Sequence, residues 1–99
     1  MNKEEYIGKT VRVTKLSSLN EISESNDHTL TLPGESWWCE GVVASFGECL
    51  WLLRTRNYNY PNGRDGIFYT SEIKELIKED NQIILITQNS KYSITEAQT

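Results

Sequence analysis

The segment WWCEGVVASFGECLWLLRTRNYNY, Trp37 to Tyr60, decides the fold class. It contains two runs rich in apolar and β-branched residues, and Gly47-Glu48 separates them. Runs of this length and composition favour β-strands, and a short connection containing glycine favours a hairpin between them. Tyr60-Pro61-Asn62-Gly63 then ends the second run with residues typical of a turn. The sequence therefore predicts two paired strands at the centre of the chain.

Strand signals also dominate on both sides of this segment. Val11 and Val13 alternate with charged residues in IGKTVRVTKL (7–16), and GIFYT (66–70) reads as a short strand. QIILITQ and KYSIT form a further predicted hairpin around Asn89-Ser90. TSEIKELIKED (70–80) allows either a helical turn capped by Ser71 or a 3₁₀ turn that leads into a strand. We expect a single all-β domain over residues 1–99, with an additional C-terminal hairpin, one short helical turn and a long acidic loop at about 17–29.

Four segments together resemble the strand order of small SH3-like barrels: IGKTVRVTKL, SWWCEGVVASF, LWLLRTRN and GIFYTSEIKEL. The pattern is similar to the ferredoxin-docking subunits of photosynthetic complexes and to Src-homology-3 domains. The latter resemblance implies that Trp37 lines a ligand groove and that the next residue packs inward. Tyr69-Thr70-Ser71 stands where Src-homology-3 domains carry a Pro-x-x-Tyr motif, so proline-rich peptides are not the expected ligand. A protein-binding barrel is the function that the resemblance implies.

Composition bounds the remaining possibilities. The chain has 99 residues, three tryptophans and a net charge of −4. Its longest apolar runs are five residues, such as CLWLL, which is too short to span a bilayer, and MNKEEYIG lacks the apolar core of a signal peptide. We therefore expect a cytoplasmic protein without membrane contact. Cys39 and Cys49 are then expected as free thiols, although a bridge between neighbouring strands remains possible.

Acidic residues concentrate in one part of the chain. No lysine or arginine lies between Lys15 and Arg54, whereas that interval contains six acids. Such an acidic surface would steer the chain toward a partner with a basic surface. Trp37 and Trp38 point to opposite faces of an extended strand, so one of them is expected to be exposed. The residues predicted to bind a protein are Glu21, Glu24, Asp27, Glu35, Trp37 and Trp38. Trp51, Tyr58 and Tyr69 are further candidate anchors, because aromatic residues are enriched at interfaces.

Catalysis, metals and cofactors are not expected. General acid–base or nucleophilic catalysis needs a base held near its target, and the one histidine, His28, lies in the acidic loop. His28 has no cysteine or histidine partner at the spacing of a zinc site. The glycines form no phosphate-binding motif, and the carboxylates do not have calcium-loop spacing. We therefore expect a binding protein that is not an enzyme.

Nucleic-acid binding is the alternative function. If residues 52–60 are extended, Arg54, Arg56 and Tyr58 share one face, and Arg64 follows in the turn. Arginines that neutralise phosphates beside aromatic rings that stack on bases are typical of single-strand-binding barrels. The acidic residues oppose this interaction, and arginine pairing with Glu40 or Glu48 across the sheet is the simpler role. A short acidic chain of this kind is similar to accessory proteins of phages and mobile elements, which suggests an inhibitor of a host defence protein. The oligomeric state is left open.

Overall fold

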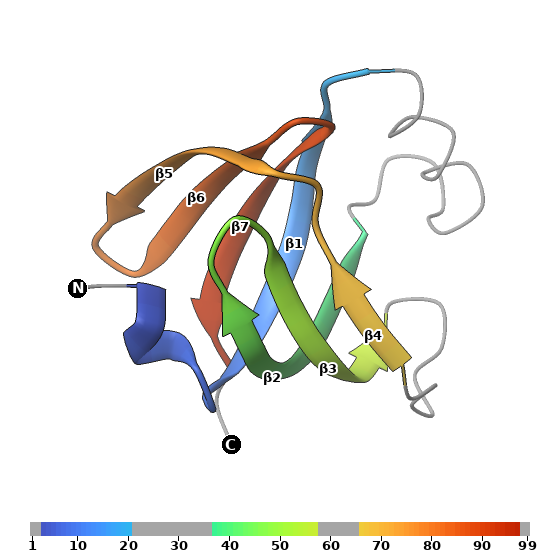
Figure 1. The fold of residues 1–99 in the computed structure, drawn as a ribbon, viewed down its shortest axis with the longest axis vertical. Coiled ribbons are helices and arrows are strands. Elements are labelled where there is room, and N and C mark those ends of the chain that lie inside the picture. Colours follow the sequence, from blue (N-terminus) through green and yellow to red (C-terminus); the bar gives the residue numbers. More distant parts are fainter. Residues whose placement is uncertain (1–2, 21–36, 58–65, 98–99) are drawn as a thin grey trace.

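A computed structural model describes residues 3–20, 37–57 and 66–97 of the chain (Figure 1). Within these ranges seven antiparallel strands follow a 3₁₀ turn, η1 (Lys3–Tyr6). The strands are β1 (Thr10–Ser18), β2 (Trp38–Phe46), β3 (Leu50–Asn57), β4 (Gly66–Tyr69), β5 (Ile73–Glu79), β6 (Gln82–Thr87) and β7 (Ser90–Glu96). They form one sheet in the order β4-β3-β2-β1-β7-β6-β5. The all-β prediction is confirmed. Among the described residues no helix is long and apolar enough to cross a membrane.

The sheet curls into a barrel-like shape because its two edge strands follow each other in the sequence. β4 lies at one edge and pairs with β3, and β5 lies at the other edge and pairs with β6. The short link from β4 to β5 therefore joins the two edges of the sheet (Figure 1). Thr70 exchanges two hydrogen bonds with Leu50, since its N–H donates to the Leu50 carbonyl (3.1 Å) and its Oγ1 accepts from the Leu50 N–H (3.0 Å). Toward the other edge, the backbone carbonyl of Glu72 accepts from the Gln88 N–H at 2.9 Å. These hydrogen bonds fix the link between the two edge strands and stabilise the curled shape of the sheet.

One side of this sheet encloses the core. In β1, Val11 and Val13 are fully buried, while Arg12 between them is exposed. The same alternation buries Leu50 and Leu52 of β3. The core consists of Val11, Val13, Trp37, Cys39, Val43, Phe46, Leu50, Leu52, Ile83, Leu85, Tyr92 and Ile94. We use "outer face" for the side of the sheet that points away from these residues.

Both predicted hairpins are present. β2 and β3 pair across the Gly47 turn, and β6 and β7 pair through Leu85 and Tyr92. The helical turn is not at residues 70–80 but at Lys3–Tyr6. β5 is a strand because Ile73 and Leu76 pack against the core while its backbone forms a ladder with β6.

The two central tryptophans lie on opposite faces, as alternation predicts. Trp37 is 7% exposed, and its ring lies 5.1 Å from that of Phe68 in the core. Trp38 is half-buried on the outer face. The arrangement implied by Src-homology-3 domains is therefore reversed, since the first tryptophan of the pair is the one that packs inward.

Candidate binding face

A strip of large apolar side chains lies on the outer face of β3 and β4. We call it the β3–β4 patch, and it consists of Trp51, Leu53, Ile67 and Tyr69. Their exposed fractions are 44%, 53%, 53% and 65% respectively. The register places Trp51 opposite Tyr69 and Leu53 opposite Ile67, so the patch is two adjacent cross-strand pairs. The Trp51 and Tyr69 rings stack with their centroids 5.5 Å apart.

The patch follows directly from the strand period. Leu50 and Leu52 point into the core, so Trp51 and Leu53 must point outward. Single exposed apolar residues are normal on proteins, but contiguous apolar patches mark interaction sites in soluble domains. Four such residues in direct register on neighbouring strands form a contiguous patch.

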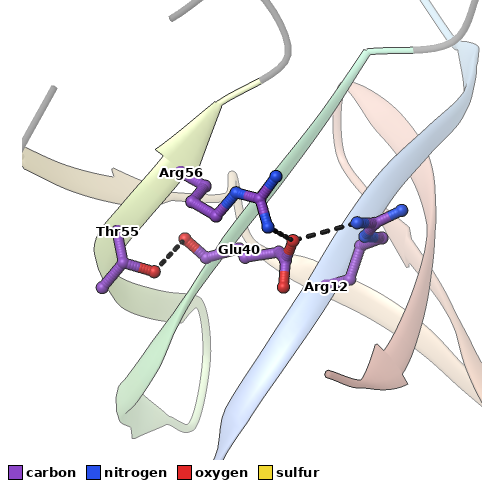
Figure 2. Close-up of polar contacts among 4 residues, drawn as sticks. All are labelled: Arg12, Glu40, Thr55 and Arg56. Atoms are coloured by element: carbon purple, nitrogen blue, oxygen red, sulfur yellow. Dashed lines mark hydrogen bonds and ion pairs between the residues drawn. The ribbon is translucent and has the colours of Figure 1, made fainter. Parts of the chain in front are cut away.

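A second group lies beside the patch on the outer face of β1, β2 and β3. We call it the arginine–tryptophan cluster, and it consists of Arg12, Trp38, Glu40 and Arg56. Glu40 Oε1 accepts from Arg12 Nη2 at 2.9 Å and lies 3.5 Å from Arg56 Nη1 (Figure 2). Both guanidinium groups also lie over the Trp38 ring, at 4.2 Å for Arg12 and 5.7 Å for Arg56. The expected pairing of an arginine with Glu40 across the sheet is confirmed.

The strand register builds this cluster. Arg12 lies opposite Glu40 in the β1–β2 pair, and Glu40 lies opposite Arg56 in the β2–β3 pair. Trp38 is two residues before Glu40 and so shares its face. Thr55 Oγ1 donates to the Glu40 carbonyl at 3.4 Å (Figure 2). The Glu40 side chain is 11% exposed, whereas the side chains of Arg12 and Arg56 are 44% and 56% exposed. Solvent therefore meets the two cations while the carboxylate lies beneath them.

Arg54 and Arg56 do not share a face. Glu40 pairs with Arg56 and Gly41 pairs with Arg54, which leaves Thr55 as an extra residue in β3. Such a bulge interrupts the alternation of side chains. Arg54 therefore stays on the side of Leu52, and its Nε is buried without a hydrogen-bond partner. Arg56 points outward to Glu40. The single arginine face expected for residues 52–60 is absent from the described part of β3.

The structure tests only part of the predicted site. Glu21, Glu24, Asp27, Glu35, Tyr58 and Arg64 lie outside the described residues. Trp37 belongs to the core, and Trp38 is the member of the pair on the outer face. Trp51 and Tyr69 were candidate anchors and are exposed. Sequence reasoning missed Arg12, Leu53 and Ile67. The alternation of Val11 and Val13 with Arg12 carried a signal for Arg12, whereas LWLL and GIFY are apolar on both faces and carried none for Leu53 and Ile67.

Cys39 has the environment of a core residue. It is fully buried, and both described cysteines are free thiols. Burial raises the pKa of the Cys39 thiol from 9.0 to about 12; the charge of Arg54 opposes this shift and that of Glu40 adds to it. A thiol held protonated is a poor nucleophile. In the described ranges no group of three or more histidine, cysteine and acidic side chains could hold a metal ion.

The raised pKa predicts a loss of stability at alkaline pH. Above pH 9 the unfolded chain loses the Cys39 proton while the folded chain keeps it up to about pH 12, so unfolding becomes easier as pH rises. We expect the free energy of unfolding to fall by about 1.4 kcal/mol per pH unit through this group. Denaturant titrations at pH 8 to 11 should show this slope above pH 9 in the wild type, and the Cys39 contribution to it should be absent in Cys39→Val. If the free energy of unfolding falls with pH equally in both proteins, the pKa of the Cys39 thiol is not raised by burial.

Neither known protein-family models, nor curated protein sequences, nor solved structures match the chain. Its function must therefore be argued from its own residues.

Proposed function

We propose that this domain is a protein-binding module that acts without catalysis and docks through the β3–β4 patch. The observation that carries the proposal is the exposure of two apolar cross-strand pairs, Trp51–Tyr69 and Leu53–Ile67. The part of these side chains that stays in water gives the fold no burial energy, whereas covering it would contribute about 25 cal/mol per Å² of apolar surface. Aromatic residues and arginine are also the types that anchor protein interfaces.

The proposal accords with the resemblance to SH3-like modules, which act by presenting a surface. It keeps protein binding, the function predicted from the sequence, but assigns the contact surface to the β3–β4 patch. The predicted acidic contact residues Glu21, Glu24, Asp27 and Glu35 lie outside the described ranges. A basic partner and an inhibitory role against a host protein stay predictions that rest on those residues and on the sequence alone.

Nucleic-acid binding remains the second candidate, because Arg12 and Arg56 lie over Trp38 on the same face of the sheet as the exposed Trp51 and Tyr69 rings. Three features weigh against it. Both guanidinium groups already contact Glu40, the chain carries a net charge of −4, and the aliphatic Leu53 and Ile67 offer no ring for base stacking.

Affinity capture from the cell that encodes the chain tests the proposal when a matched control is included. Leu53→Glu places a charge in the patch, and Ile7→Glu places the same charge on a residue of similar exposure, 50% against 53%, outside the patch. We expect the captured amount of at least one protein to fall about tenfold with Leu53→Glu and to stay unchanged with Ile7→Glu, since a buried charge at an interface is costly. Thermal unfolding should show that both variants are folded.

Two outcomes would overturn the proposal. One is equal capture by the wild type and Leu53→Glu. The other is salt-sensitive binding of single-stranded oligonucleotides that Arg56→Gln weakens and Leu53→Glu leaves unchanged, which would instead support the nucleic-acid function.

A further inference from the structure

On strands β1 to β4 the charge of the outer face differs in sign from the net charge of −4 that the whole chain carries. Strands β1 to β4 contain four basic residues, Arg12, Lys15, Arg54 and Arg56, and a single acid, Glu40. Lys15 is buried, and the Arg54 Nε lies on the core side. The outer face of these strands thus presents Arg12 and Arg56, with Glu40 beneath them, next to the β3–β4 patch.

Both arginines keep donors for a further anion. A guanidinium group has five N–H donors, and Glu40 contacts Nη2 of Arg12 and Nη1 of Arg56. Because both groups reach the same Glu40 oxygen, they lie close enough to each other for one added carboxylate to contact both. Their exposed fractions, 44% and 56%, leave them open to a partner.

The arginines are also held in place before any partner arrives. Both guanidinium groups lie over the Trp38 ring, and Glu40 contacts both of them from the neighbouring strand position. Fixing an arginine side chain costs about 0.5–1.5 kcal/mol of conformational entropy when an interface forms, and a side chain that is already held loses less. A pre-organised pair of arginines is suited to a carboxylate, with which guanidinium forms directional hydrogen bonds.

The patch and the cluster form one surface along β3. Leu53 precedes Arg56 by three residues, and with the Thr55 bulge between them both lie on the outer face. A partner segment that covers Leu53 and Ile67 therefore meets Arg56 at the end of the patch. The apolar part of this surface matches aliphatic and aromatic side chains, and the cationic part matches an acid.

We propose that the β3–β4 patch receives an acidic–apolar protein segment, which places apolar side chains on Trp51, Leu53, Ile67 and Tyr69 and an aspartate or glutamate against Arg12 and Arg56. The inference rests on the proposed protein-binding function and adds the chemical class of the partner. It differs from the basic partner predicted from the acidic loop, because it concerns a different face.

Selection from a library of random twelve-residue peptides tests this inference. We expect the wild type to select peptides in which aspartate or glutamate lies beside aliphatic or aromatic residues. A synthetic peptide of that set should bind about tenfold more weakly to Arg12→Gln/Arg56→Gln, and its affinity should fall as salt rises. Leu53→Glu should abolish its binding.

A matched control separates local charge from net charge. Lys9→Gln/Lys74→Gln removes the same two positive charges from exposed ion pairs with Glu96 and Glu72. We expect this control to bind the peptide like the wild type. If Arg12→Gln/Arg56→Gln is unstable, Arg56→Gln alone should still weaken binding, because Arg12 remains paired with Glu40 at 2.9 Å.

The possible failures are distinguishable. Selected peptides that depend on Leu53 but lack acidic residues would overturn the acidic–apolar inference and leave the proposed binding function intact. Equal weakening by the lysine control would also overturn it. A selection without any peptide sensitive to Leu53→Glu would overturn the proposed function itself.

Discussion

Leu52→Ala is expected to lower the free energy of unfolding by about 2–5 kcal/mol. Leu52 has an exposed fraction of 0% and packs in the core between the two sides of the curled sheet. Removing its three outer carbons loses their transfer free energy and leaves a cavity that the neighbouring strands can only partly fill. Urea denaturation followed by tryptophan fluorescence measures the loss.

The adjacent Leu53→Ala provides the control. Leu53 is 53% exposed on the outer face, so the same truncation should change stability by no more than about 0.5 kcal/mol. The two variants have the same composition and differ only in which face loses the side chain. Similar losses for both would show that the patch is buried in solution and would remove the basis of the proposed binding function.

The face of each strand residue could be predicted from the sequence only where polar and apolar residues alternate. Val11 and Val13 alternate with Arg12, and their burial follows. In Leu50–Leu53, both faces are apolar, so the period cannot tell which side forms the core. Pairing decides it, because Leu50 and Leu52 meet the inward residues of the neighbouring strands while Trp51 and Leu53 pair with exposed residues of the edge strand β4.

Bulges were also beyond the sequence pattern. The extra residue at Thr55 sends Arg54 and Arg56 to different faces, and no composition rule places such an insertion in LLRTRN. In β5, Ile73, Leu76 and Ile77 have a spacing that suits a helix as well as a strand. The ladder to β6 decides for the strand, since non-local pairing overrides weak local preference.

Gly41→Ala is expected to destabilise the domain by about 2–4 kcal/mol, through crowding rather than a cavity. A Cβ atom at Gly41 would lie 2.6 Å from the Leu53 carbonyl oxygen and 3.1 Å from the Arg54 Cα, both of which are backbone atoms. Neither can move without shifting β3 at the bulge. The gain of about 0.5–1 kcal/mol that alanine usually brings over glycine in a strand is smaller than this cost.

Gly47→Ala is the matched control, since a Cβ there would meet no atom within 4 Å. We expect its free energy of unfolding to be unchanged or higher by up to about 1 kcal/mol, because alanine restricts the unfolded chain. Urea denaturation of both variants tests the contrast.

Gly41→Ala should also weaken patch-dependent binding beyond its effect on the folded fraction, since the same backbone shift displaces Leu53 and separates Arg56 from Glu40. Wild-type stability in Gly41→Ala would show that β3 does not approach β2 this closely at the bulge. The inference that the β3–β4 patch and the arginine–tryptophan cluster form one surface along β3 would then be wrong as well.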